Sequence, residues 1–360
     1  MSSAGADRQS GRKLMKVLAG ETLPTPPIWL MRQAGRYLPE YRATRADAGG
    51  FLNLCYTPAL AAEVTLQPIR RYGFDAAILF SDILVVPDAL GQDVRFLEGE
   101  GPKLEPIRSA AELGRLDRGK TADKFARVCE TVSRLRQDLP NETTLIGFCG
   151  APWTVATYVV GGEGSSDQAE ARRFAYRDPT GFQQLMEILV DTSVDYLDQQ
   201  IVAGADTVMI FDSWAGTLPD REFAAWVTAP TARLVRDLQR RHPNVPVIGF
   251  PRGAGSNALG YVKETGIRGV GCDTAMPLRD MRALATESGI AVQGNIDPLL
   301  LVSGGEALDR RIDETLEALR GLPHIFNLGH GIVPDTPPEN VGRLVDRVRA
   351  FAPAATRVSA

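Results

Sequence analysis

Residues 145–150 read LIGFCG and residues 207–212 read TVMIFD, and these two stretches indicate the fold most clearly. Both are apolar almost throughout instead of alternating between apolar and polar positions. A continuous apolar run of this length is typical of a strand in a parallel sheet whose two faces are both buried. Runs of the same kind recur along the chain, and each is followed by a longer segment with helical spacing. The eight predicted strands are 28–31, 75–80, 145–150, 207–212, 247–250, 269–273, 291–295 and 324–328.

The segments between the predicted strands carry the start and stop signals of helices. A capping residue followed by proline opens two of them, at 57–58 and 178–179, and Gly73 and Gly204 close the same two segments. Residues 336–339 read TPPE, which predicts a capping box before the last helix. Eight strands that alternate with helices predict an α/β fold, a (β/α)8 TIM barrel in a single domain. A doubly wound open sheet is the alternative, but no glycine-rich dinucleotide turn follows the first strand.

The barrel is expected to span residues 24–352, with an N-terminal tail at 1–23 and a C-terminal tail at 353–360. Two stretches interrupt the alternation. Residues 83–120 show no clear helix and predict an insertion after the second strand, either a hairpin or an oligomer contact. Residues 161–168 read GGEGSSDQ, a polar loop that would lie at the barrel mouth and act as a lid, or else be an inert surface loop.

Composition and charge exclude several classes of protein. The 360-residue chain is 44% hydrophobic and 23% charged, which is ordinary for a globular protein and excludes a disordered or collagen-like chain. Its formal net charge of −4 argues against a basic nucleic-acid-binding protein. No apolar stretch reaches about 18 residues and no apolar signal segment opens the chain. We therefore expect a cytoplasmic protein with neither a nucleic-acid nor a membrane partner.

The cationic residues and the possible metal ligands are also informative. Arginine supplies 34 of the 40 cationic residues, which reflects either GC-rich codons or a need for planar groups that hold carboxylates. The four cysteines and three histidines show no C-x-x-C, H-x-C or H-E-x-x-H spacing, so we expect no metal site. Cys149 and Cys272 lie in apolar runs and are expected to be buried, reduced thiols.

Active-site groups of a barrel lie at the C-terminal ends of its strands and in the loops that follow them. These positions hold cations, carboxylates, hydroxyls and one histidine but no lysine, which disfavours a Schiff-base aldolase. Two or three inward-facing arginines predict a polyanionic substrate held by charge-assisted hydrogen bonds. The candidates are Arg32, Arg36, Arg252, Asp82, Asp212, Asp273, Asp297, Tyr158, Ser213 and His330.

Each candidate also has a structural alternative. Arg32 and Arg36 are four residues apart and would suit a solvated helix face, although Gly35 between them favours a ligand-binding loop. Asp82 would equally suit a turn cap. His330 stands between two glycines, which indicates a close backbone approach more than a core position. A core position or a helix cap remains the alternative for Tyr158, Ser213, Asp273 and Asp297.

Six motifs at these strand ends resemble the uroporphyrinogen decarboxylase family of haem biosynthesis. The resemblance covers residues 24–351, and its first motif is long and specific. The motifs are PIWLMRQAGRYLPEYR at 27–42, AAILFSDILVVPDALG at 76–91, GFCGAPWTVATY at 147–158, IFDSWAG at 210–216, VQGNIDP at 292–298 and NLGHGI at 327–332.

The resemblance implies a homodimeric carboxy-lyase with a (β/α)8 barrel and no metal or organic cofactor. It would remove four carboxyl groups from the acetate arms of uroporphyrinogen III to give coproporphyrinogen III. Asp82 would accept the pyrrole N–H groups and stabilise a cationic ring, and Arg32 would be the second catalytic residue. Arg32 is too weak an acid to give up a proton, so a protonated Asp82 and a water molecule both stay open as donors. The implied substrate-binding residues are Arg32, Gln33, Ala34, Gly35, Arg36, Asp82, Tyr158, Ser213 and His330.

Two other functions are kept as alternatives. A related cobamide-type methyltransferase would need a zinc-thiolate site, and neither Cys149 nor Cys272 has a histidine two residues before it. A catalytically inactive barrel that only binds tetrapyrroles would be expected to lack the acid or the arginines, and this chain has them.

Overall fold

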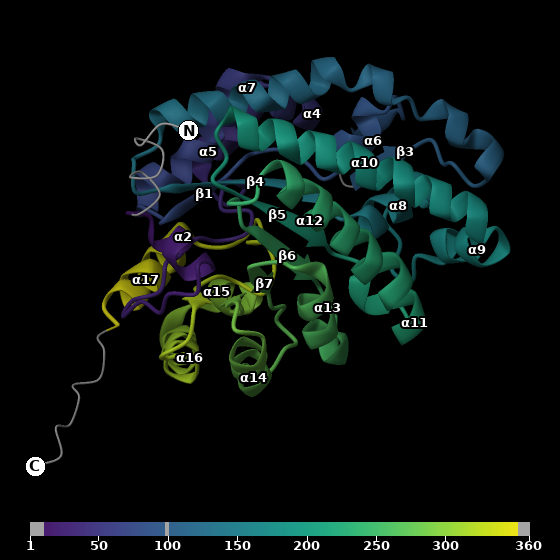
Figure 1. Ribbon diagram of the computed structural model, residues 1–360. Coiled ribbons are helices and arrows are strands. Elements are labelled where there is room, and N and C mark those ends of the chain that lie inside the picture. The colour runs from purple at the N-terminus through teal and green to yellow at the C-terminus, as the bar shows by residue number, and fades with distance from the viewer. Residues whose placement is uncertain (1–10, 98–100, 352–360) are drawn as a thin grey trace, which may run out of the picture.

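The computed structural model describes residues 11–97 and 101–351, in which strands and helices alternate as predicted (Figure 1). The central sheet has seven parallel strands, each hydrogen-bonded to the next one along the chain. The strands are β1 (Ala76–Ile78), β4 (Thr144–Gly150), β5 (Thr207–Asp212), β6 (Val247–Pro251), β7 (Gly269–Gly271), β8 (Ala291–Gln293) and β9 (His324–Ile325).

Ile28 closes this sheet into a barrel. It pairs in parallel with Phe326, directly after β9. Its carbonyl oxygen accepts the Asp75 N–H, directly before β1, at 2.9 Å. Ile28 therefore lies between the two edge strands and is bonded to both sides, so the predicted (β/α)8 barrel is confirmed.

The prediction of a full strand at 28–31 is wrong beyond this bridge. The N–H of Leu30 donates to the Gln33 side-chain oxygen at 3.0 Å instead of to a neighbouring strand. The Gln33 amide nitrogen in turn donates to the Ala76 carbonyl oxygen at 3.1 Å. A glutamine side chain thus replaces the backbone ladder where the chain turns into the first loop.

Helices surround the barrel, and shorter helices lie in the loops. The main outer helices are α5 (Pro58–Tyr72), α7 (Ala122–Asp138), α10 (Pro179–Ala203), α12 (Ala229–Arg241), α13 (Ala258–Thr265), α14 (Leu278–Ser288), α16 (Gly305–Ala318) and α17 (Pro338–Arg349). The shorter ones are α2 (Lys13–Leu18), α3 (Pro39–Asp47), α4 (Phe51–Tyr56), α6 (Val85–Ala89), α8 (Pro152–Gly161), α9 (Ala169–Arg177), α11 (Asp220–Phe223) and α15 (Pro298–Ser303).

The predicted helix starts at Pro58 and Pro179 are correct, but the predicted cap at Thr57 is wrong, because its hydroxyl donates to the Asn53 carbonyl oxygen at 2.7 Å instead of accepting a helix N–H. Asp178 caps α10 by accepting the Gly181 N–H at 2.9 Å, and Gly73 ends α5 with φ of 62°. The capping box at 336–339 is wrong. Helix α17 begins at Pro338 with a proline before it in the capping position, and the buried Thr336 hydroxyl has no hydrogen-bond partner in the described part of the chain.

The predicted insertion at 83–120 contains a hairpin, as one of the two expectations had it. Strand β2 (Val94–Leu97) pairs with β3 (Gly101–Leu104), but the segment also contains α6, which the sequence pattern did not reveal. The hairpin meets the loop after α8, because the Leu104 N–H donates to Gly162 at 2.7 Å and Lys103 forms an ion pair with Glu163.

The described part of the predicted N-terminal tail packs against the barrel. Helix α2 buries Leu14 and Val17. Arg12, directly before it, forms a buried ion pair with Asp206 and donates to the Asn141 carbonyl oxygen at 2.8 Å. The predicted C-terminal tail at 353–360 lies outside the described residues.

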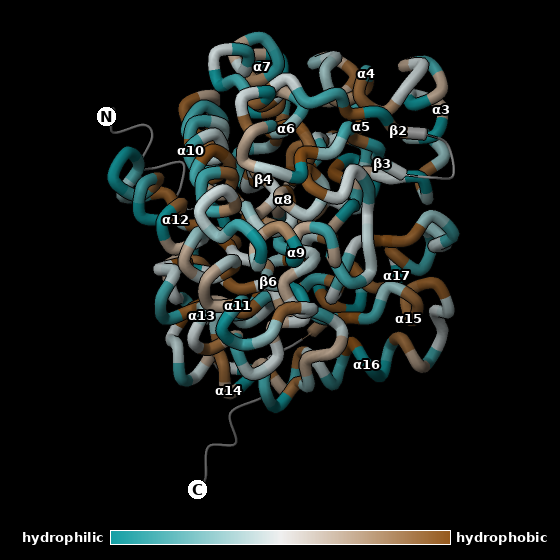
Figure 2. The backbone as a smooth tube through the Cα atoms, turned by 90° about the vertical axis from the view of Figure 1, so that its right-hand side faces the viewer, coloured by the Kyte–Doolittle hydropathy of each residue, from teal (hydrophilic) through white to brown (hydrophobic). Residues whose placement is uncertain are grey.

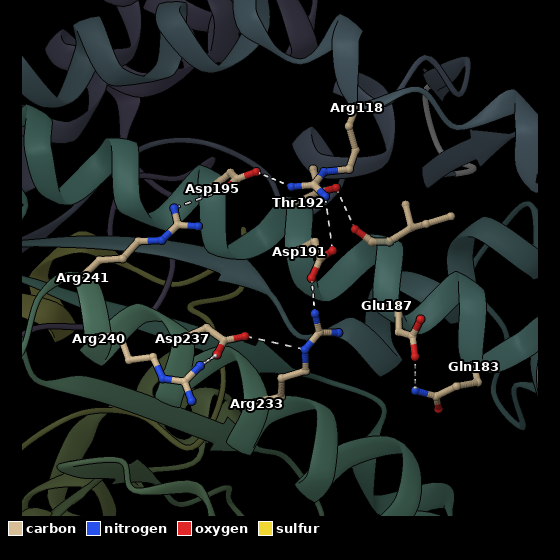
Figure 3. Close-up of polar contacts among 11 residues, drawn as sticks. Arg118, Gln183, Glu187, Asp191, Thr192, Asp195, Arg233, Asp237, Arg240 and Arg241 are labelled. Carbon is tan, nitrogen blue, oxygen red and sulfur yellow. Dashed lines mark hydrogen bonds and ion pairs between the residues drawn. The ribbon is translucent and has the colours of Figure 1, made fainter.

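Several of the many arginines form ion pairs on the outer surface. Figure 3 shows Asp191 on α10 between Arg118 and Arg233, and Asp195 between Arg118 and Arg241. Pairs as exposed as these each contribute little to stability. These arginines lie on the helix layer rather than in the barrel mouth, so the arginine total says little about the substrate.

The outer helices are amphipathic. Their tubes alternate between hydrophilic and hydrophobic bands in Figure 2, as expected for helices that cover a barrel on one side and meet water on the other. Among the helices of residues 11–97 and 101–351, we find none that combines the length and the apolar character needed to cross a bilayer.

Candidate active site

The C-terminal ends of the strands open on the right-hand side of Figure 1, where α6, α8, α9 and α11 lie, and this side faces the viewer in Figure 2. Aromatic rings line the barrel below it. Phe211 lies two residues beyond Met209, whose sulfur contacts the Gln293 side chain inside the barrel at 3.9 Å. The rings of Phe148 and Phe250 flank Phe211 at centroid distances of 5.5 and 6.0 Å. The floor of the mouth is therefore apolar and suits an organic ring system.

Arg32 is the residue at which the predicted site converges. Its φ of 60° lies in the left-handed region, which residues other than glycine rarely adopt and which is most often maintained at functional sites. Its side chain runs across Gly331, where any added side chain would overlap the Arg32 Cδ. Its positive charge lowers the pKa values of Asp82, Tyr158 and His330. The charge of one guanidinium group thus acts on three predicted site residues, two from loops and one from helix α8.

Asp82 follows β1 and is half-buried. One of its oxygens accepts the Leu84 N–H at 2.8 Å, so the turn-cap alternative is correct for that oxygen. The other oxygen makes no hydrogen bond within the described residues. Burial raises the pKa of the carboxyl from 3.8 to about 6, outweighing the opposing effects of the Leu84 N–H and Arg32. Asp82 can therefore change its protonation state close to neutral pH.

Two hydroxyl groups lie on neighbouring units of the barrel. Tyr158 on α8 is half-buried, and burial raises the pKa of its phenol, while a hydrogen bond with the Trp214 side chain lowers it. The Asp82 charge also raises the Tyr158 pKa, which places the two groups in the same environment. Ser213, directly after β5, is half-buried and makes no side-chain hydrogen bond to any described residue. An indole N–H can only donate, so the Tyr158 O–H is still available to a ligand, as is the Ser213 hydroxyl.

His330 lies opposite these groups, with its ring 6.4 Å from Phe250. Burial, together with the charges of Arg32 and Arg252, lowers its pKa from 6.5 to about 4, while the charge of Asp273 opposes this shift. The imidazole is therefore neutral at neutral pH. A neutral ring can donate one hydrogen bond and accept another.

Two of the candidate carboxylates have structural roles, and a third lies outside the mouth. Asp273 accepts the Gly253 N–H at 2.6 Å, and Asp297 caps α15 by accepting the N–H two residues on at 2.9 Å, as the structural alternative had it. Placing Asp212 in the mouth was wrong. Successive strand residues face opposite sides of the sheet, so Asp212, which follows Phe211, is buried towards the helix layer.

The loop after the Ile28 bridge supplies backbone donors to the site. The N–H groups of Ala34, Gly35 and Arg36 make no hydrogen bond to any described residue, and the side chains of Arg32 and Arg36 are exposed. Successive free N–H groups after a left-handed residue form a concavity that favours anions.

Gln33 stands apart from these donors. It is fully buried, and its carbonyl oxygen accepts the Tyr37 hydroxyl at 2.9 Å. Its backbone N–H donates to Leu30 at 3.0 Å, and its side chain is used in the barrel ladder. Gln33 supports the loop from behind, while its neighbours face outward.

Sequence reasoning missed Arg45 and the aromatic floor. Arg45 on α3 lies over the Phe51 ring at 5.1 Å and has a buried guanidinium nitrogen without a partner among the described residues. Arg45 and Asp82 both influence the pKa of the buried Cys55 thiol, so a further cation lies near the catalytic candidate. Arg45 lies on α3 rather than at a strand end, which is why position alone did not select it.

The cysteines and histidines do not gather. In residues 11–97 and 101–351, no group of three or more His, Cys, Asp or Glu side chains has the arrangement of a metal site. Cys149 and Cys272 are free, buried thiols as predicted, and burial raises the pKa of both.

Comparison with known proteins agrees with this geometry. The profile of the family described as "Uroporphyrinogen decarboxylase (URO-D)" matches residues 9–351. The chain belongs to the uroporphyrinogen decarboxylase family. It is 57% identical to the uroporphyrinogen decarboxylase of Rhizorhabdus wittichii over 94% of this chain and 97% of that protein. It is 56% identical to that of Rhodospirillum rubrum over the same shares.

Solved structures support the fold of this uroporphyrinogen decarboxylase family member. A methyltransferase from Methanosarcina mazei superposes with a TM-score of 0.77 at 20% identity, over 94% of this chain and 98% of that one. A B12-independent methionine synthase from Shewanella gives a TM-score of 0.51 at 11% identity, over 92% and 95% of the two chains. At these identities the likeness shows the shared barrel alone.

Proposed function

We propose that this chain decarboxylates the four acetate arms of uroporphyrinogen to give coproporphyrinogen. The observation that carries the proposal is the half-buried Asp82, with its raised pKa, beside Arg32 at the mouth of an aromatic-floored barrel. The apolar floor suits the macrocycle, and the cations and free N–H groups around it suit its carboxylate arms.

The reaction needs no electron sink beyond the substrate. A proton adds to the pyrrole ring, which becomes cationic. The bond from the acetate CH2 to its carboxylate then breaks, CO2 leaves, and the electron pair forms an exocyclic double bond that neutralises the ring. A second proton adds to that CH2 carbon while the ring releases the first, so each cycle consumes one proton and leaves a methyl group.

Asp82 is placed to stabilise the charged ring. An ionised carboxylate only accepts hydrogen bonds, and the oxygen not used by Leu84 can take pyrrole N–H groups. When the ring gains its proton, the same carboxylate faces a new positive charge in a site from which bound substrate excludes water, where attraction is stronger than in bulk water. A protonated Asp82 and a water molecule are the two candidate proton donors.

The remaining residues are proposed to hold the arms. Arg32 and Arg36 pair with carboxylates, assisted by the free N–H groups of the loop between them. Three further residues are proposed to contact the carboxylate arms: Tyr158, Ser213 and His330. We also propose that the protein is cytoplasmic and forms a homodimer. Sedimentation at micromolar concentration tests the homodimer, and a monomer would contradict it.

Anaerobic incubation with uroporphyrinogen III tests the function. The purified protein is first dialysed against a chelator, and the products are separated after oxidation to porphyrins. We expect intermediates with fewer carboxyl groups and then coproporphyrin. Unchanged substrate would refute the proposed function, and activity that a chelator abolishes and a single metal restores would refute a cofactor-free reaction.

A further inference from the structure

Asp212 is a buried carboxyl group that the proposed mechanism does not use. It ends β5 and is only 1% exposed. One of its oxygens accepts the Thr154 hydroxyl of α8 at 2.5 Å. The other oxygen has no hydrogen-bond partner in the described part of the chain. A buried carboxyl that is only half satisfied is costly, so its position calls for a role.

Thr154 links Asp212 to the loop after β5. Its hydroxyl oxygen also accepts the Trp214 N–H at 3.2 Å. A hydroxyl has one proton, and because Asp212 receives it, the lone pairs of the oxygen are left for Trp214. The neighbouring Trp153 indole donates to the Trp214 carbonyl oxygen at 3.2 Å. Both backbone groups of Trp214 are therefore held by the first turn of α8.

These contacts join two proposed arm-binding residues. Ser213 stands between Asp212 and Trp214 in the chain. Tyr158 lies four residues after Thr154, on the same face of α8, and its phenol interacts with the Trp214 side chain. We propose that Asp212 is a positioning residue which, through Thr154, sets the places of Ser213 and Tyr158 for the carboxylate arms; this inference rests on the proposed function.

The surroundings of Asp212 make this role dependent on pH. Thr154 of α8 faces Asp212. The charge of Asp212 raises the pKa of Tyr261 on α13, in addition to the effect of burial. No described lysine or arginine forms an ion pair with it. Burial raises the Asp212 pKa to about 7. Above that pH the group gains a negative charge behind a site for polyanions, so the KM for uroporphyrinogen is expected to rise on the alkaline side.

Steady-state kinetics of four variants test the proposal. Thr154→Val and Asp212→Val remove the link, and we expect each to raise KM about tenfold, the scale of one lost hydrogen bond, with kcat nearly unchanged. Asp212→Asn keeps the acceptor and should retain the wild-type KM below pH 7, without the alkaline rise. Thr157→Val is the matched control, because the buried Thr157 hydroxyl donates only to the Thr154 carbonyl oxygen of the same helix.

A purely structural role is distinguished by the same set. It would lower the melting temperature of Thr154→Val and Thr157→Val alike and leave KM unchanged in both. A wild-type KM in Thr154→Val overturns the inference, whatever happens to stability and even if Asp212→Val fails to fold.

Hydrogen exchange of residues 213–217 gives a readout that needs no substrate. Exchange should be faster in Thr154→Val and unchanged in Thr157→Val and Asp212→Asn. Equal exchange in all variants would overturn the positioning. A wild-type protein that does not convert uroporphyrinogen would refute the proposed function instead, while the exchange data still decide whether Asp212 orders this loop.

Discussion

Replacing Asp82 by asparagine should slow turnover and stabilise the fold at the same time. Asparagine keeps the size of the side chain and an oxygen for the Leu84 N–H. It removes the charge and presents an N–H group where an acceptor of pyrrole N–H groups is proposed. We expect turnover to fall at least about 100-fold, the scale found when one preorganised electrostatic stabiliser is lost.

The gain in stability follows from the raised pKa. The pKa of Asp82 rises from 3.8 to about 6 on folding. At about 1.4 kcal/mol per pKa unit, keeping Asp82 ionised in the fold costs at most about 3 kcal/mol, and we expect about 1–2 kcal/mol because the side chain is only half-buried. The unfolded chain ionises first, so the advantage of Asp82→Asn is absent below pH 3.8 and complete above about pH 6.

Denaturant titrations across this pH range and anaerobic turnover assays measure the two effects. Asp335→Asn, which changes an exposed carboxylate in the loop after β9, is the control and should alter neither. Asp82→Glu should retain more activity than Asp82→Asn, because it keeps the charge. An Asp82→Asn variant that works at the wild-type rate, or that is less stable than wild type at neutral pH, would refute the reasoning.

Three further predictions concern the site and the barrel. Arg32→Ala should raise the transition-state free energy by about 2–5 kcal/mol, Arg32→Lys should recover part of it, and Arg36→Ala should cost less because Arg32 acts on more site groups; equal kcat/KM losses would contradict this order. Gly331→Ala should lower kcat/KM, because its methyl group would overlap the Arg32 side chain. An unchanged kcat/KM would show that Arg32 does not have to lie across residue 331 to function. Burial lowers the His324 pKa from 6.5 to about 4, so the stability that the neutral ring contributes is complete above pH 6.5 and is lost as the pH falls towards 4. His324→Gln should therefore lose part of the wild-type pH dependence of the urea midpoint. An unchanged pH dependence in this variant would show that His324 is not its source.

Local sequence determined the parts of this protein that depend on local physics. Continuous apolar runs placed the seven assigned strands, because a strand buried on both faces cannot alternate with polar residues. Asp178 and Gly73 marked helix ends, since a capping carboxylate and a left-handed glycine act within a few residues of themselves. Counting from strand ends also selected Arg32 and Asp82, because the mouth of a barrel is built from those positions.

Only the tertiary structure decided which side of the sheet these residues face and which residues they contact. Asp212 and Phe211 are neighbours in sequence, yet one faces the helices and the other the barrel, because strand side chains alternate and the register depends on pairing with β4 and β6. Gln33 became part of the barrel ladder because a distant residue, Ala76, offered its carbonyl oxygen. The approach of Asp82, Tyr158 and His330 to Arg32, and the raised pKa of Asp82, depend on the packing of segments far apart in the chain, which no local pattern records.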